Sequence, residues 1–321
     1  MSKTTMHRPA RTISDDALSA AWHAADAVAA ASGVTVTIAR TPEQSHAIST
    51  VLAEIWPQEN GASQLEANLL RALEFSGNYV SLATTTDVGE PQIIGACVGF
   101  FGPPAEHHLH SHIAGVSAHR ERHGVGRALK LHQRAWALER GTEEISWTFD
   151  PLIARNANFN LSRLGVEITA YIPDFYGPMI DLRNAGQHSD RLVATWRLQD
   201  ARVVALARGE RRPFDSSRHV TEVAGGGLAA AADVTEWISV NRGEPVLIEG
   251  PASTRLATPE AATLGILRVP ADYEGLRSDD AALAGRWRDT VREALARTVG
   301  AGESRIVGFE KNVGYLLEAL P

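Results

Sequence analysis

The residues best suited to chemistry form a glycine-containing loop at the start of a helix, between Arg120 and Arg127. Gly124 and Gly126 let backbone N–H groups approach an anion closely, and the helix N-terminus adds the positive end of its dipole. A tightly packed turn would use the same two glycines. Arginine, however, suits phosphate recognition, and this loop carries Arg120, Arg122 and Arg127. The pattern therefore favours a phosphate or pyrophosphate site.

A histidine-rich stretch precedes the loop. His108, His110 and His112 alternate along the chain, so in a strand they point to one face while His107 points away. Three readings are open. The imidazoles bind zinc, they form a packed or solvated cluster, or one of them is a general base, since imidazole titrates near neutral pH.

The surrounding pattern predicts the elements that hold these residues. Small and apolar residues alternate from His108 to Ser117, which is typical of a strand, and a helix is indicated by Val125, Leu129, His132 and Trp136. A second strand, Glu144–Pro151, and a helix from Ala154 to Leu164 follow. Upstream, the pattern predicts a strand from Val34, helices from Thr41 to Trp56 and from Ala62 to Phe75, and two strands joined by a turn at Gly89.

This order of elements resembles the GNAT superfamily of acyl-CoA-dependent N-acyltransferases, from Val34 to Leu198. The family's phosphate loop reads Arg/Gln-x-x-Gly-x-Gly/Ala, and Glu121, Gly124 and Gly126 occupy its fixed positions. Glu121 departs from the family pattern, and Arg120 or Arg122 would supply the missing charge. The segment TFDPLIARNANFN, followed by YGPM, resembles the sequences of a bacterial branch of this superfamily that is associated with N-acylation of amino acids, including N-succinylation.

The resemblance implies a set of residues that bind the coenzyme A donor. The strand from Glu144 splays from the histidine strand in this family, and the pantetheine arm pairs into the notch like an added strand. Asn156 would donate a hydrogen bond to that arm, although it lies nearer to Gly165 than the family spacing. The expected binding residues are Val116, Arg120, Arg122, His123, Gly124, Val125, Gly126, Arg127 and Asn156.

The resemblance also implies catalytic roles. His110 and His112 fall where the similar arylalkylamine N-acetyltransferases carry a His-x-His pair that relays a proton through water, so they are the expected general base, with His110 first. Many members place a tyrosine, as acid for the CoA thiolate, where this chain has Leu161. Tyr176 is the expected substitute. Arg155 is the expected partner of a substrate carboxylate, although Asp150 and Arg155 would also suit a structural pair.

Composition narrows the class of protein. The net charge of −7 and pI near 6.0 argue against nucleic acid as a partner, since phosphate backbones need a basic face. The single cysteine, Cys97, lies in an apolar run, which excludes an internal disulfide and fits a reducing cytoplasm. No segment reaches the roughly 18 uninterrupted apolar residues of a membrane span. We expect a cytoplasmic protein with no membrane or nucleic-acid partner.

We expect an α/β (α+β) fold in which a GNAT-like mixed, mostly antiparallel sheet is flanked by helices, with a second, smaller α/β domain. Residues 1–33 form an extension with a helix stopped at Gly33, residues 34–198 the acyltransferase domain, and residues 199–321 a C-terminal α/β domain with Ser278 as the N-cap of its long helix. Three roles for this last domain stay open: a degenerate second GNAT-like half, a lid over the acceptor, or a dimerisation surface.

The function expected from these residues and the resemblance is transfer of an acetyl or succinyl group from acyl-CoA to the amine of a small molecule, an amino acid first. The co-substrate would be acetyl-CoA or another acyl-CoA such as succinyl-CoA, and no metal is expected. Two alternatives remain: a non-catalytic acyl-CoA-binding sensor or scaffold, favoured by Glu121 and Leu161, and a histidine-ligated metalloprotein.

Overall fold

The structure is a computed structural model of the whole chain. It describes residues 13–57, 63–86, 89–103, 107–117, 124–177, 188–210, 220–223, 227–230, 234–241, 243–248 and 264–320. The chain divides into two compact units. The first comprises residues 1–147, 181–183 and 196–210, and the second comprises residues 148–180, 184–195 and 211–321. The predicted domain limits at residues 33 and 198 follow the sequence resemblance and stay a prediction.

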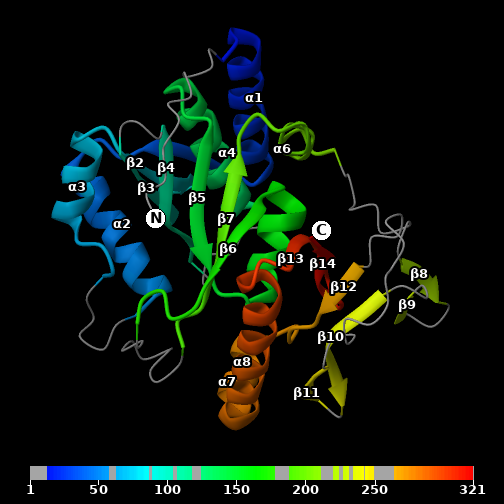
Figure 1. Cartoon of the computed structure of the whole chain (residues 1–321). Helices are drawn as coiled ribbons and strands as arrows, with labels where there is room; N and C mark the ends of the chain where they lie inside the picture. Colours follow the sequence, from blue (N-terminus) through cyan, green and yellow to red (C-terminus); the bar gives the residue numbers. More distant parts are fainter. Residues whose placement is uncertain are drawn as a thin grey trace. The chain divides into compact units, whose positions relative to one another are not determined.

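The first unit contains the histidine strand at the centre of a sheet (Figure 1). Neighbouring strands follow the chain order, β1-β2-β3-β4-β5. The first four pair antiparallel, and β5 lies parallel to β4. Their bounds are β1 Val34–Ile38, β2 Tyr79–Thr85, β3 Ile93–Phe101, β4 His108–Val116 and β5 Glu144–Phe149.

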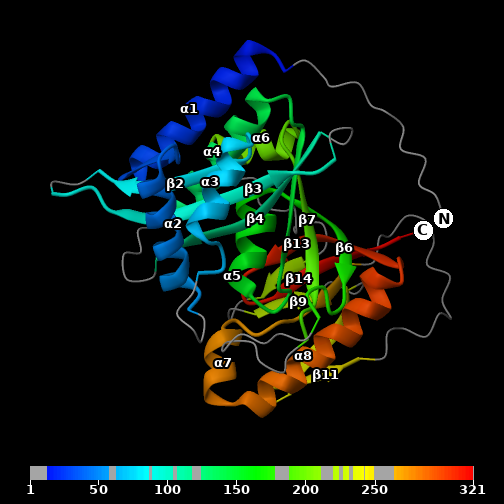
Figure 2. The same cartoon turned by 90° about the vertical axis from the view of Figure 1, so that its left-hand side faces the viewer.

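Helices cover both faces of this sheet because successive side chains of a strand point to opposite faces. Val80 and Leu82 of β2 pack in a core cluster with Ile48 of α2 (Pro42–Ile55) and Leu70 of α3 (Ala67–Phe75), two helices that Figure 2 shows in front of the strands. Tyr79 precedes Val80 and therefore points to the opposite face, where its hydroxyl lies near the Leu129 carbonyl of α4 (Val125–Glu139), the helix that packs on that face.

Helix α4 is itself covered by the N-terminal helix α1 (Asp15–Ala31). Ala21, Ala25 and Ala29 form a buried stripe at four-residue spacing on α1, and such small side chains allow two helices to approach closely. As a result every α4 residue from Ala128 to Leu138 is buried, polar ones included. The predicted stop at Gly33 is confirmed, since this glycine has a φ of +64°, in the left-handed region.

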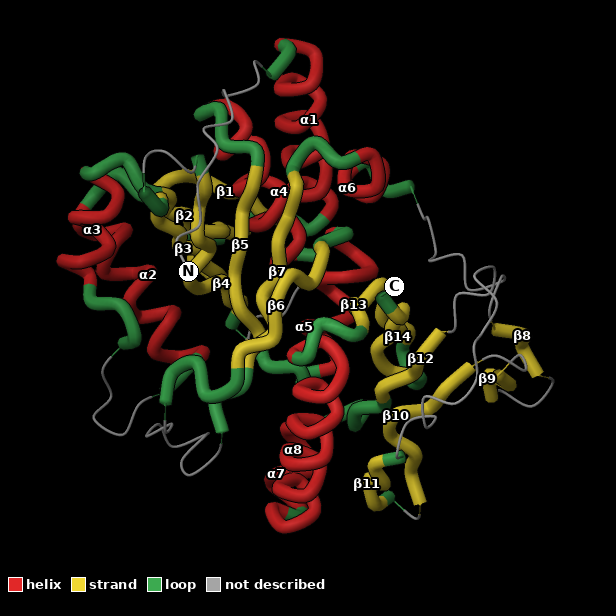
Figure 3. The backbone as a smooth tube through the Cα atoms, in the orientation of Figure 1, coloured by secondary structure: helices red, strands yellow, loops and turns green. Residues whose placement is uncertain are grey.

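The second unit holds two further sheets and a helical pair (Figure 3). A five-stranded sheet has the order β11-β10-β12-β14-β13, in which β10 and β12 are parallel and the other pairs antiparallel, and β8 and β9 form a separate pair. The bounds are β8 Val220–Val223, β9 Gly227–Ala230, β10 Val234–Asn241, β11 Glu244–Leu247, β12 Leu264–Leu267, α7 Tyr273–Asp279, α8 Ala281–Leu295, a π-helix Ala296–Gly300, β13 Ser304–Glu310 and β14 Gly314–Ala319. Together with the first unit, this confirms the predicted fold class.

The remaining elements connect these parts along the chain. In the second unit, α5 (Ala154–Ala157) runs into a π-helix, Asn158–Leu164, that Gly165 ends, and β6 (Glu167–Ile172) pairs antiparallel with β7 (Arg191–Arg197). The division between the units crosses β5 and β7. Helix α6 (Ala201–Ala207) belongs to the first unit.

Several local predictions were wrong. Ser278 does not cap the long C-terminal helix but lies inside α7, while Asp280 caps α8 by accepting a hydrogen bond from the Leu283 backbone N–H. The helix predicted from Ala62 begins at Ala67 among the described residues. Soon after Leu198 comes α6, a helix that was not predicted, and no strand was predicted at β6. Its alternation is broken by a register shift between Ile168 and Ala170, which explains the miss.

Candidate functional site

The site begins with a fork between the two parallel strands of the first unit. Strand β4 pairs with β5 only where His108 to His110 face Glu144 to Ser146. Beyond that point β4 continues to Val116 and β5 to Phe149 without further pairing between them among the described residues. The backbone edge of β4 from Ser111 onward is therefore free of a β5 partner. A strand-like ligand can pair with such an edge.

A β-bulge shapes β4 just beyond the closed end of the fork. On β3, Val98 and Gly99 are consecutive, but their partners on β4 are Ile113 and Ser111. His112 is thus the extra residue, and a bulge of this kind bends its strand and aims side chains differently. It places His112 at the surface while Ser111 stays buried.

The predicted histidines are brought together by this geometry. The rings of His110 and His112 lie 6.1 Å apart, at 5.1 and 5.8 Å from the ring of Phe100 on β3. His108 Nε2 lies 2.7 Å from Ser146 Oγ of β5. The rings of His110 and His112 both contact Phe100, which confirms the prediction that these two side chains share one face of the strand.

Loss of contact with water makes both rings favour the neutral form, although His112 keeps part of its surface exposed. Desolvation lowers the pKa of His110 to about 4, with smaller contributions from the nearby charges of His112, His108 and Lys130. Desolvation likewise lowers the pKa of His112. A neutral imidazole can accept a proton, so at neutral pH both rings are in the form that a general base requires.

On the other face of the fork lies a buried lysine that the sequence did not single out. Lys130 of α4 is 3% exposed, and its Nζ donates hydrogen bonds to Ser111 Oγ (3.0 Å) and to Gln133 Oε1 (2.7 Å). Its ammonium lies 3.7 Å from the centre of the Trp147 ring of β5. Desolvation lowers the pKa of Lys130 to about 8. The signal that sequence reasoning missed was a lysine on the apolar face of a helix.

The glycine loop is described in part. Arg120, Glu121, Arg122 and His123 lie outside the described residues. Gly124 is the N-cap of α4 with a φ of +98°, and a Cβ at this position would collide with Ser32 Oγ of the α1 C-terminus. At Gly126, in the first helical turn, a Cβ would meet no atom within 4 Å. Gly126 itself therefore places no side chain in front of the N–H groups of the first turn, which have no partner within the helix.

Arg127 has a partner far along the chain. Its Nη2 donates to the carbonyl oxygens of Leu206 (2.7 Å) and Ala207 (3.2 Å), in the last turn of α6. Arginine satisfies helix-terminal carbonyls in this way. The structure thus gives Arg127 a contact with α6, and its contact with the cofactor stays a prediction. Val116 ends β4 opposite Gly95 of β3, and Val125 is buried.

A tryptophan closes the open stretch of the fork from the α2 side. The indole of Trp56, just after α2, packs against Gly115 of β4, where a Cβ would come within 2.6 Å of the ring. Only glycine leaves room for this contact. Trp56 thus contributes a wall next to the part of β4 that lacks a β5 partner.

The other predicted residues belong to the second unit. Tyr176 is half exposed, with its ring 5.2 Å from the guanidinium of Arg191. Arg155 forms an exposed ion pair with Glu274 at 2.9 Å, and Asn156 is exposed on α5. Their predicted roles stay predictions. Asp150, the alternative to Arg155, accepts two hydrogen bonds from Arg288, at 2.8 and 2.7 Å.

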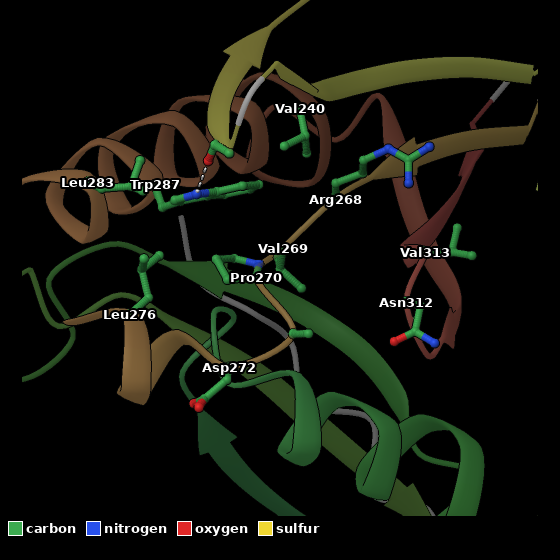
Figure 4. A pocket seen from close by; sticks show the side chains of 12 residues that line it. Val240, Arg268, Val269, Pro270, Asp272, Leu276, Leu283, Trp287, Asn312 and Val313 are labelled. Atoms are coloured by element: carbon green, nitrogen blue, oxygen red, sulfur yellow. Dashed lines mark hydrogen bonds between the residues drawn. The ribbon is translucent and has the colours of Figure 1, made fainter. Parts of the chain in front are cut away.

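The second unit also has a cavity of about 380 Å³ (Figure 4). Its walls are mostly apolar, with Val240, Leu276 and Trp287 among them, and the Trp287 indole N–H donates to the Gly243 carbonyl. The described lining residues include no histidine, cysteine or lysine. Elsewhere in the described part of the chain, no group of three or more His, Cys, Asp or Glu side chains is arranged to hold a metal ion. Nor does any described helix have the length and apolar character to cross a membrane.

Comparisons with known proteins find similarity in structure only: no family model matches the chain, and no curated protein does. Similar solved structures include the ribosomal-protein-S18-alanine N-acetyltransferase of Escherichia coli (15% identity, TM-score 0.41, covering 52% of this chain and 96% of that one). An acetyltransferase of the GNAT family from Streptococcus pneumoniae has 13% identity and a TM-score of 0.40, covering 50% and 98%. Aminoglycoside 6′-acetyltransferase type Ii has 15% identity and a TM-score of 0.40, covering 51% and 97%.

Proposed function

We propose that this protein is an acyl-CoA-dependent N-acyltransferase that transfers an acetyl or succinyl group to the amine of a small molecule, with amino acids as the first class to test. One observation carries the proposal. A strand fork, a side-chain-free helix N-terminus and a pair of neutral histidines occur together in the first unit. A transferase that uses a thioester of a phosphorylated carrier has a use for each of them: an anion site, a strand edge for the carrier arm and a base for the acceptor.

The helix N-terminus would hold the anionic end of the donor. The open first turn of α4 at Gly126 offers N–H groups and the positive dipole end to the diphosphate. The pantetheine arm would then extend along the free edge of β4 toward the closed end of the fork. In this pose the thioester carbonyl would lie beside the bulge at His112, and a backbone N–H there would stabilise the developing oxyanion.

The histidine pair would activate the acceptor. An amine arrives as an ammonium and must lose a proton before it can attack the thioester carbon. His110 accepts that proton, directly or through a water shared with His112, because its ring is neutral at pH 7. The C–N bond forms, the C–S bond breaks, and its electron pair leaves on the sulfur as CoA thiolate. The nitrogen gives its second proton to solvent as the amide forms.

Leu161 favours a second candidate, a non-catalytic acyl-CoA-binding protein. This residue is 1% exposed at the position where the family resemblance leads us to expect a tyrosine acid. Binding without turnover would identify this alternative.

Thermal melting with CoA, acetyl-CoA and succinyl-CoA in large excess tests the proposal. A ligand at about a hundred times its dissociation constant stabilises the native state by about 2.7 kcal/mol, which raises the melting temperature by a few degrees. The best thioester is then combined with a panel of amino acids and amines, and thiol release is followed. A melting shift with thiol release supports the transferase; a shift without release supports the binding protein. The absence of a shift with all three ligands would refute both.

A further inference from the structure

The buried ammonium of Lys130 lies at the point where the fork opens. Ser111 is the first β4 residue after the last paired position, His110, and Trp147 is the first on β5 after Ser146. Lys130 contacts both, as donor to Ser111 Oγ and over the Trp147 ring. On the α4 side, it therefore bridges the first pair of β4 and β5 residues that are no longer paired with each other.

This charge has no anionic partner within the described part of the chain. The groups that face it are the Cys97 thiol of β3, His110 and Ser111 of β4, Gln133 of α4, and the rings of Trp147 and Trp196. Burying an ammonium without a counter-charge is unfavourable. The chain has only three lysines, and one of the three is buried here without a counter-charge.

Ser111 can pass the influence of the ammonium into the fork. Because its Oγ accepts a hydrogen bond from Lys130, its own hydroxyl hydrogen is left to donate. The one protein acceptor near it among the described residues is Cys97 Sγ at 3.9 Å, which is a long contact. A second acceptor that entered the fork would receive a hydrogen bond polarised by a cation.

We propose that Lys130 and Ser111 form a cationic donor pair that stabilises the thiolate of departing coenzyme A at the closed end of the fork. This inference rests on the proposed function. With the diphosphate at the α4 N-terminus, the free edge from Val116 back to Ser111 spans about 17 Å at 3.3–3.4 Å per residue. The thioester end of the pantetheine arm thus reaches toward Ser111. When the C–S bond breaks, its electron pair stays on the sulfur, Lys130 keeps its proton, and the thiolate takes a proton from water after release.

Equilibrium binding of coenzyme A and desulfo-coenzyme A tests the pair, because the two ligands differ only in the sulfur. The wild-type protein should bind coenzyme A about tenfold more tightly at pH 8, since hydrogen bonds to charged groups reach this strength. Lys130→Met, close in length and neutral, should remove the preference and leave desulfo-coenzyme A binding unchanged. Ser111→Ala should reduce the preference with a smaller change to the core.

Cys97→Ala is the matched control, because it removes a thiol of the same cluster that is outside the proposed donor pair. It should keep the preference for coenzyme A, and it allows the ultraviolet absorbance of the bound thiolate to be followed without a protein thiol. The pair is refuted if the wild-type protein binds both ligands equally, or if Lys130→Met weakens both by the same factor. Failure of the wild-type protein to bind either ligand would instead refute the proposed function itself.

Discussion

Substitution of Gly126 tests the anion site at the α4 N-terminus with little disturbance of the fold. A Cβ at this position meets no atom within 4 Å, and replacing a helical glycine stabilises a protein by about 0.5–1 kcal/mol. A carboxylate in the first turn adds about 0.3–1 kcal/mol through the helix dipole. Gly126→Asp should therefore be as stable as the wild-type protein or more stable. About 4 Å from a bound phosphate, however, the same carboxylate is repelled by ~4 kcal/mol at an effective dielectric constant near 20.

That repulsion corresponds to a loss of roughly a thousandfold in affinity for coenzyme A, which isothermal titration calorimetry can measure. Gly126→Asn is the matched control, since it has the same shape without the charge, and it should lose much less affinity. Gly124 is unsuitable because its φ of +98° and its contact with Ser32 would make any side chain unfold the helix start. If Gly126→Asp bound coenzyme A as tightly as Gly126→Asn, the diphosphate would have to bind elsewhere.

Three further outcomes are expected. The His110→Ala, His112→Ala double variant should lose about 100- to 10,000-fold in turnover while keeping its affinity for coenzyme A, and unchanged turnover would remove the base. Burial lowers the pKa of His132 to about 4, so as the pH falls the unfolded chain binds a proton at this residue before the folded chain does. The free energy of unfolding, measured with urea, should therefore fall by up to about 3 kcal/mol between pH 6.5 and 4 because of His132. His132→Leu should make this pH dependence weaker. Arg288→Met leaves the mostly buried Asp150 with only Arg191, at 3.9 Å, and should lower the free energy of unfolding by about 3 kcal/mol. The double variant with Asp150→Ala should lose less, and equal losses would show that the pair does not couple.

The parts of the fold that the sequence predicts correctly are set by neighbouring residues. The helix predicted from Thr41 is found as α2, and a capping box between Thr41 and Gln44 fixes its start. Asn312 and Gly314 have positive φ and turn the last hairpin, a conformation that suits these two residue types. Each of these signals involves residues only a few positions apart, which is the range that periodicity and turn chemistry can read.

Contacts over long sequence distances explain what could not be predicted. Arg127 was expected at a phosphate, yet its guanidinium binds carbonyls of α6 that lie 79 and 80 residues further on. Asp150 meets Arg288 across 138 positions. The burial of Lys130 depends on its packing against Ser111 of β4 and Trp147 of β5, two contacts that the sequence around Lys130 does not specify. Local sequence patterns therefore predicted the histidine strand and the start of α4. The contacts at the closed end of the fork could be found only from the packing of the folded chain.

The fork contains two titratable groups, His110 and Lys130, and burial lowers the pKa of both. At neutral pH, however, the first is uncharged and the second is charged. The pKa of His110 is lowered to about 4 and that of Lys130 to about 8. Between these values the imidazole is neutral and ready to accept a proton, while the ammonium is charged and ready to stabilise an anion, an arrangement that suits acid–base division of labour. The pH profile of kcat/KM should therefore be flat from about pH 5 to 7, without the limb that an ordinary histidine gives near 6.5, and should fall near pH 8. Lys130→Met should remove the alkaline limb. It should also raise the acid one slightly, because the lysine charge helps to lower the pKa of His110. An acid limb near pH 6.5 in the wild-type protein would show that the base is a solvent-exposed group and not His110.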